Sequence, residues 1–73
     1  MDEEVNAIYS VSSYLVVVCE LSVRLLSSEH VEVDRYVANG VLGSSWWQGN
    51  DLCVSGDSEQ ITLMLEAGHL KLL

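Results

Sequence analysis

Three residues that can ligate a metal ion occupy every second position of one segment: His30, Glu32 and Asp34. Imidazole and carboxylate groups are common ligands of zinc. Along an extended strand, however, side chains on one face are spaced by roughly 6.5 to 7 Å, which is too far apart for a compact three-ligand site unless the strand bulges. We therefore predict no metal site here, and we expect a solvated face opposite Val31 and Val33.

The nucleophilic residues lack the partners that catalysis needs. No serine lies in a Gly-x-Ser-x-Gly elbow, and the two histidines are far apart in the sequence. Cys19 and Cys53 are flanked by apolar residues, which favour the thiol over the reactive thiolate. No Lys-Ser or Lys-Thr pair follows Gly40 and Gly43, so these glycines do not form a phosphate-binding loop. The sequence therefore predicts that the protein is not an enzyme and uses no cofactor.

Two adjacent tryptophans, Trp46 and Trp47, are candidates for a protein interface. Neighbouring residues of a strand point to opposite faces, and a single covering layer buries only one of them. An exposed tryptophan among serine and amide side chains has the composition of an interface hot spot. The alternative is that an irregularity at Gly43 or Gly49 buries both rings.

Charge gives the main indication of a partner. The chain carries three lysine and arginine residues against eleven aspartate and glutamate residues, a net charge of −8. Such a field repels phosphate groups, so neither nucleic acid nor a membrane surface is an expected direct partner, whereas a basic protein surface is attracted. Glu29, Glu32 and Asp34, with Glu20 across a predicted hairpin, are the best candidates for a partner-binding cluster, and dispersed solubilising charge is the alternative.

Other features indicate where the protein works. A disulfide-built protein of this length would usually carry more cysteines, so we expect Cys19 and Cys53 to be reduced, buried thiols; a disulfide between neighbouring strands is the alternative. The acidic start, from Met1 to Glu4, lacks the positive region of a secretory signal. The uncharged stretch 5–19 is shorter than the roughly 20 residues of a membrane span. These features predict a cytoplasmic protein.

The elements that position these residues begin with a strand predicted over residues 14–26, in which every second residue is apolar. On the second face of this strand, Val16 and Val18 also need cover, whereas the residues after them are polar. An apolar patch without cover is typical of a contact with another chain. We therefore expect Val16 and Val18, with Leu70 and Leu72 near the C-terminus, to form a homodimer contact if the protein assembles.

Weaker patterns define the remaining strands. Alternation over 2–13 favours a strand, although the acidic residues at its start would also suit a helix N-terminus. Asn39-Gly40 is typical of a type I′ turn between antiparallel strands. Further strands are expected at 31–37, 41–47, 52–54 and 70–72, and a second turn at 48–51.

One helix is predicted near the C-terminus. Asp57 and Gln60 have the spacing of a helix cap and its reciprocal partner, so the helix would run from Asp57 to about Ala67. Its buried stripe would consist of Ile61, Met64 and Leu65. Gly68 is placed to end the helix in a left-handed conformation, and His69 is better placed to cap its carbonyls than to catalyse a reaction.

Together these patterns predict one α+β domain over residues 1–73, an antiparallel meander of four or five strands with one helix packed on one sheet face. The expected function is that of a small acidic module that binds another protein and inhibits a basic, nucleic-acid-handling complex. In size and charge alone, the chain is similar to phage-encoded antagonists such as anti-CRISPR proteins. The alternative is a structural or assembly subunit that homo-oligomerises through its apolar sheet face.

Overall fold

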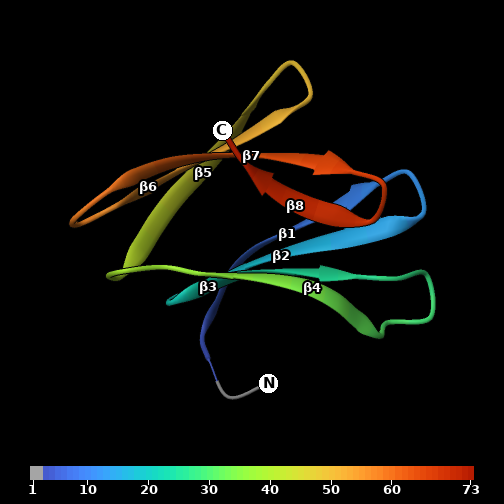
Figure 1. Cartoon of the computed structure of the whole chain (residues 1–73). Helices are drawn as coiled ribbons and strands as arrows, with labels where there is room; N and C mark the ends of the chain where they lie inside the picture. The colour runs from blue at the N-terminus through green and yellow to red at the C-terminus, as the bar shows by residue number, and fades with distance from the viewer. Residues whose placement is uncertain (1–2) are drawn as a thin grey trace.

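A computed structural model describes residues 3–73, which form eight β-strands and no helix. The strands make two antiparallel meanders of four strands each, in the orders β1-β2-β3-β4 and β5-β6-β7-β8. Their bounds are β1 Val5–Val11, β2 Tyr14–Cys19, β3 Ser22–Leu26, β4 Glu32–Val37, β5 Leu42–Gln48, β6 Asp51–Gly56, β7 Gln60–Glu66 and β8 His69–Leu72. The two sheets lie one above the other as two layers (Figure 1). The prediction of an α+β fold is therefore wrong, because the described chain is all β.

The single strand predicted over 14–26 is two strands, β2 and β3, joined by a tight turn at 20–21. Val18 pairs with Val23 across this hairpin. The residues that point into the core are even-numbered in β2 and odd-numbered in β3, so the alternation changes phase at the turn. Because most residues on both faces of β2 are apolar, the period-two pattern did not reveal that change.

The segment predicted as a helix from Asp57 is the strand β7. Alternate residues of β7 pack into or against the core: Ile61, Leu63 and Leu65. Asp57 lies in the turn before β7 and caps no helix. Ala67 and Gly68 have φ angles of 52° and 78°, and two successive positive φ angles are typical of a type I′ hairpin turn. The left-handed conformation predicted at Gly68 is present, but it joins β7 to β8 instead of ending a helix.

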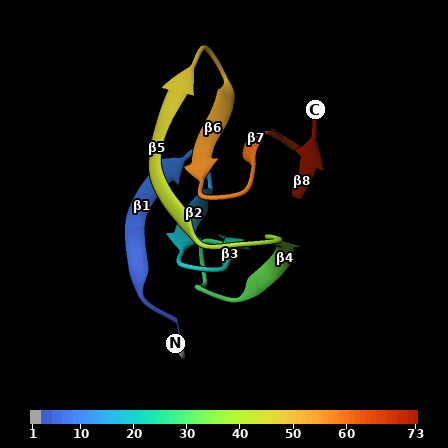
Figure 2. The ribbon, with the colours of Figure 1, turned by 90° about the vertical axis from the view of Figure 1, so that its left-hand side faces the viewer.

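Asn39 and Gly40 do not form the predicted hairpin turn. They lie in segment 38–41, which carries the chain from β4 in the first sheet to β5 in the second (Figure 2). In residues 3–73, positive φ angles occur elsewhere, so this pair does not use the conformation of a type I′ turn. A Cβ at Gly40 would collide with the side chains of Asp57 and Ser58, so close packing explains this glycine.

Strands are present at five positions where alternation predicted them, namely β1, β4, β5, β6 and β8, and Gln48 pairs with Asp51 across the predicted turn. Asp2, at the start of the first predicted segment, lies outside the described residues. The orientation of β4 differs from the prediction, because Val33 and Val37 are exposed while Tyr36 packs against the core.

A bulge in β4 explains why its residues do not share the predicted faces. Leu25 pairs with Asp34 and Leu26 with Glu32, which leaves Val33 as an extra residue in the strand. Asp34 therefore points toward the second sheet and Glu32 toward the outside. His30 precedes the strand in a loop, where its φ is 64°. The three residues considered as metal ligands thus point in different directions.

The core lies between the two sheets and contains Val16, Val18, Val23, Leu25, Leu42, Leu52, Val54, Ile61 and Leu63. Val16 and Val18 are 1% and 0% exposed. The second sheet thus provides the cover that these two valines need, and in the folded chain they are not accessible to another copy.

Side chains of the first sheet form hydrogen bonds along both edges of the second sheet. On one side, the Asn6 amide donates a hydrogen bond to the Leu42 carbonyl at 3.0 Å, and the Tyr9 hydroxyl lies 2.6 Å from the Ser45 hydroxyl. On the other side, the Leu70 amide donates to the Asp34 carboxylate at 2.7 Å. Each of these contacts joins an edge strand of one sheet to an edge strand of the other and keeps the layers in register.

Candidate functional site

The four carboxylates predicted as one binding cluster are not brought together. Glu20 lies in the turn before β3 and Glu29 in the loop after it, so the length of a five-residue strand, about 17 Å, separates them. Asp34 faces the second sheet, where it bonds to the Leu70 amide. Glu32 is occupied by ion pairs with two arginines. The predicted surface therefore does not exist as a unit.

A largely buried ion-pair network lies on the outer face of the first sheet. Arg24 is only 7% exposed, and its guanidinium forms an ion pair with Glu3. The Glu3 carboxylate also accepts hydrogen bonds from the Leu21 amide at 2.8 Å and from the Ser22 hydroxyl at 3.0 Å. The hydrogen bond from Arg24 holds the pKa of Glu3 below its ordinary value, although desolvation opposes this shift. The role of this network is to stabilise the fold, because it holds Glu3 against Ser22 and Arg24 of β3.

The second arginine is also used within the protein. Arg35 donates to Glu32 through Nε and Nη2, at 3.0 and 3.1 Å, while Arg24 lies 3.7 Å from the same carboxylate. The remaining basic residue of the sequence is Lys71 in β8. Both arginines thus neutralise carboxylates of the first sheet.

Backbone hydrogen bonds join four acidic residues or their chain neighbours at one end of the sandwich, which we call the acidic end: Glu4, Glu20, Asp57 and Glu59. Backbone hydrogen bonds hold its segments together. The Glu20 amide donates to the Glu4 carbonyl at 2.9 Å, and the Asp57 amide donates to the Val41 carbonyl at 3.0 Å. Figure 2 looks onto this end, where the β2–β3 turn, the crossover and the β6–β7 turn meet. In the described part of the chain, no lysine or arginine pairs with these four carboxylates.

Glu59 anchors the crossover at the acidic end. Its carboxylate accepts hydrogen bonds from the Asn39 side-chain amide at 3.0 Å and from the Tyr36 hydroxyl at 3.2 Å. Burial, together with the nearby negative charge of Glu59, raises the pKa of Tyr36. Sequence reasoning missed Glu59 and assigned Asp57 to a helix cap, because only the two-sheet topology brings both residues close to Glu20.

Asp34 and His69 lie at the other side of the sandwich, between β4 and β8. Backbone amides of Leu70 and Arg35 donate to the Asp34 carboxylate at 2.7 and 2.8 Å, and these bonds lower the pKa of Asp34. The His69 Nδ1 is 3.8 Å from Asp34 Oδ2, and its side chain is exposed. Since no helix precedes His69 in the described chain, its predicted capping role is wrong. The Asp34 carboxylate therefore links β4 of the first sheet to β8 of the second.

The adjacent tryptophans point to opposite faces of the second sheet. Trp46 lies on the outer face opposite Cys53 and is 41% exposed. Trp47 points toward the first sheet, where its ring meets Tyr9 edge to face with centroids 5.4 Å apart. The alternative in which both rings are buried is thus not observed. Trp46 is available for contact, and Trp47 is part of a cleft described next.

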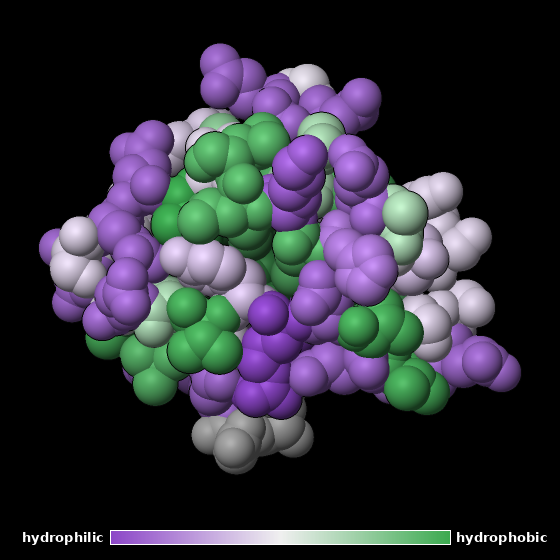
Figure 3. Space-filling model, viewed as in Figure 1, coloured by the Kyte–Doolittle hydropathy of each residue, from purple (hydrophilic) through white to green (hydrophobic). Residues whose placement is uncertain are grey.

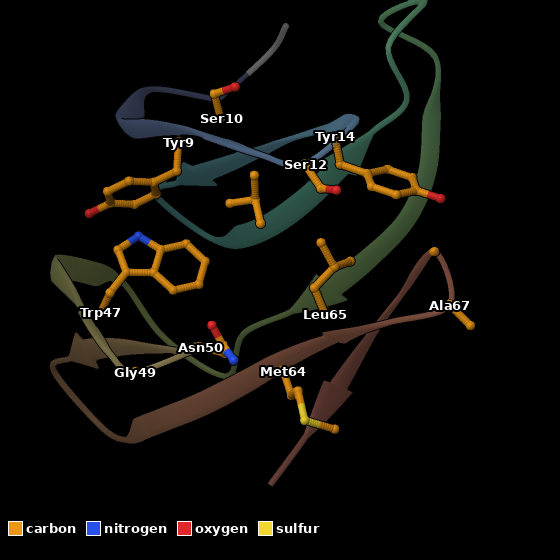
Figure 4. Close-up of a pocket in the computed structure, with 12 residues that line it drawn as sticks. Tyr9, Ser10, Ser12, Tyr14, Trp47, Gly49, Asn50, Met64, Leu65 and Ala67 are labelled. Carbon is orange, nitrogen blue, oxygen red and sulfur yellow. The ribbon is translucent and has the colours of Figure 1, made fainter.

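A cleft opens between the sheets away from the acidic end, with a volume of about 660 Å³ (Figure 4). Tyr9 and Trp47 lie at one side of it and Tyr14 at the other, and Leu65 lies between them. A Cβ at Gly68 would come within 3.0 Å of the Tyr14 hydroxyl, so a side chain there would crowd the cleft wall. Sequence reasoning identified only Trp47, because the tyrosines come from distant turns and strands.

The other residues considered for assembly lie near the C-terminus. Leu70 packs against the core from β8, whereas Leu72 is 53% exposed. Exposed apolar side chains also occur on the outer side of β4 and in the loop before it: Val31, Val33 and Val37. On the face seen in Figure 3, hydrophobic groups are separated by polar ones and do not form one continuous patch.

Cys19 and Cys53 are buried in different sheets, and no disulfide joins them. Burial raises the pKa of Cys19. Within residues 3–73 there is no group of three His, Cys, Asp or Glu side chains arranged to hold a metal ion. The same residues contain no helix with the length and hydrophobicity needed to cross a membrane.

Comparison with protein-family models, with curated proteins and with solved structures finds no match.

Proposed function

We propose that this protein is a small, non-enzymatic module that binds a basic surface of another protein through its acidic end. The observation that carries this proposal is the separation of charges: both arginines are paired within the first sheet, whereas Glu4, Glu20 and Asp57 have no cationic partner in the described chain. An uncompensated acidic surface steers a basic partner toward it and repels acidic competitors.

The nature of the partner follows from the same charge. With a net charge of −8, the protein competes with phosphate groups for a basic surface, so a protein that handles nucleic acid is the proposed target. Binding at such a surface would block access of the nucleic acid, which makes inhibition the proposed outcome. The crossover and turns of the acidic end are joined by backbone hydrogen bonds, so little ordering entropy would be lost on binding.

Affinity capture with matched charge variants tests this proposal. Tagged protein is used to capture partners from a lysate of its native cells, as wild type and as the triple variant Glu4→Gln, Glu20→Gln, Asp57→Asn. The control triple, Glu29→Gln, Asp51→Asn, Glu66→Gln, removes the same charge from positions outside the acidic end. We expect recovery of the partner to fall by about tenfold or more with the first variant and much less with the control, because local charge governs encounter.

The salt dependence completes this test. A basic partner recovered at low salt should be lost from the wild type at high salt, since exposed charges are screened beyond about 8 to 10 Å at 0.10 to 0.15 M salt. Equal recovery by both triple variants would contradict the proposed role of the acidic end. An acidic partner, or one whose recovery is unaffected by salt, would contradict the proposed electrostatic mechanism.

A structural or assembly subunit is the second candidate. The observation that favours it is the exposure of Val33 and Val37 in β4, an edge strand of the first sheet, and of Val31 in the loop before it. In this case the tagged protein would capture only untagged copies of itself, equally with all three baits and at both salt concentrations. Val16 and Val18 take no part in such a contact, because both are in the core.

A further inference from the structure

We propose that the cleft between the two sheets binds an uncharged, ring-bearing small molecule. Its volume of about 660 Å³ lies within the range of roughly 300 to 1,000 Å³ that is usual for small-molecule sites. The site is independent of the proposed function, because the acidic end contributes no residue to it.

The residues that line the cleft indicate the charge of the ligand that it can bind. Each of the twelve lining residues is uncharged, although the chain as a whole has a net charge of −8. A charged ligand would lose part of its hydration in this open cleft and find no opposite charge among the lining residues. The cleft therefore accepts neutral molecules, and anions are additionally repelled by the field of the whole protein.

The shape of the cleft favours a flat ring. Tyr9 and Trp47 form one wall, in which their rings meet edge to face, and Tyr14 lies at the opposite side (Figure 4). The apolar side chain of Leu65 lies between these walls. Aromatic walls bind rings through stacked or edge-to-face contacts. The Asn50 side chain also lines the cleft, and its amide offers both a donor and an acceptor to a polar group on the ligand.

Two dyes that share one skeleton test the proposal. N-phenylnaphthylamine is neutral, and anilinonaphthalene sulfonate carries an added anionic group; both become fluorescent in an apolar site. We expect saturable binding of the neutral dye at one site, with an affinity at least about tenfold higher than that of the sulfonate. Equal affinities, or no saturable binding of the neutral dye, would overturn the proposal.

A cleft-filling variant locates the site. Asn50→Tyr adds a ring at an exposed turn position that lines the cleft and should reduce binding of the neutral dye by at least about tenfold. Ser44→Tyr adds the same ring at an exposed position of β5 outside the cleft and should leave binding unchanged. Equal effects of the two substitutions would overturn the assignment.

The indole N–H signals of the wild type give a measurement that needs no variant. Titration with the neutral dye should shift the signal of Trp47, which lines the cleft, and leave that of Trp46 on the outer face unchanged. A shift confined to Trp46 would place the dye on the outside of the second sheet and contradict the proposal.

Discussion

Val18→Glu should unfold the protein at neutral pH. Val18 is 0% exposed and belongs to the core between the two sheets. A carboxyl group placed there would be either ionised without a partner or protonated at neutral pH, and either state costs several kcal/mol. A single core of this size supplies only about 3 to 5 kcal/mol in total. The far-ultraviolet circular dichroism of the variant should therefore lose its β signal, and gel filtration should show an expanded chain.

Val37→Glu is the matched control for that substitution. Val37 is 67% exposed on the outer face of β4, so the new carboxylate stays in water. We expect a change in the free energy of unfolding of less than about 1 kcal/mol, measured by urea denaturation. If the Val18→Glu variant stayed folded and became monomeric, this result would support the assembly contact predicted from the sequence. The same result would contradict the packing of the two sheets around Val18.

Loss of the Glu3 carboxylate should also lower the thermal stability of the protein strongly. Glu3→Ala removes a carboxylate that bonds to Arg24, Ser22 and the Leu21 amide, so the buried Arg24 guanidinium loses one of its carboxylate partners. Breaking one side of a buried ion pair is much more damaging than replacing both sides. We expect Glu3→Ala to lower Tm clearly more than Glu29→Ala in an exposed loop, and Arg24→Met combined with Glu3→Ala to recover part of the loss.

The same network predicts the pH dependence of stability. The pKa of Glu3 is lower in the folded state than its ordinary value of 4.5, so its contribution is complete above that value. The contribution is lost as the pH falls from 4.5 through the lowered pKa, because the unfolded chain then binds the proton more readily. Urea denaturation between pH 7 and pH 2 should show this decline in the wild type and a weaker one in Glu3→Ala. Parallel pH profiles would contradict the role assigned to Glu3.

Strand positions were largely predictable from the sequence, but the partners of the strands were not. Five segments with alternating residues are strands, because each has one face directed to the core. The hairpin at 20–21 was missed because β2 is apolar on both faces, and the helix was predicted because Asp57 and Gln60 have a capping spacing that a turn also satisfies. Local sequence patterns do not reveal that segment 60–66 pairs with β6. This pairing is what makes the segment a strand.

The candidate site was less predictable than the fold. The opposite orientations of Trp46 and Trp47 followed from strand geometry alone. The acidic end was not predictable, because Asp57 comes close to Glu4 and Glu20 only when the two sheets face each other. The bulge at Val33 also separated Glu32 from Asp34, which a regular strand would have placed on one face.

The positions of the acidic end and of the cleft both depend on the two sheets facing each other. The most direct test is a nuclear Overhauser spectrum of the wild-type protein, in which ring protons of Tyr9 and Trp47 should give strong cross-peaks, since their centroids are 5.4 Å apart. Cross-strand contacts between β6 and β7 should accompany them. Absence of the Tyr9–Trp47 contact, together with helical medium-range contacts over 57–67, would contradict the two-sheet structure and favour the helix predicted from the sequence.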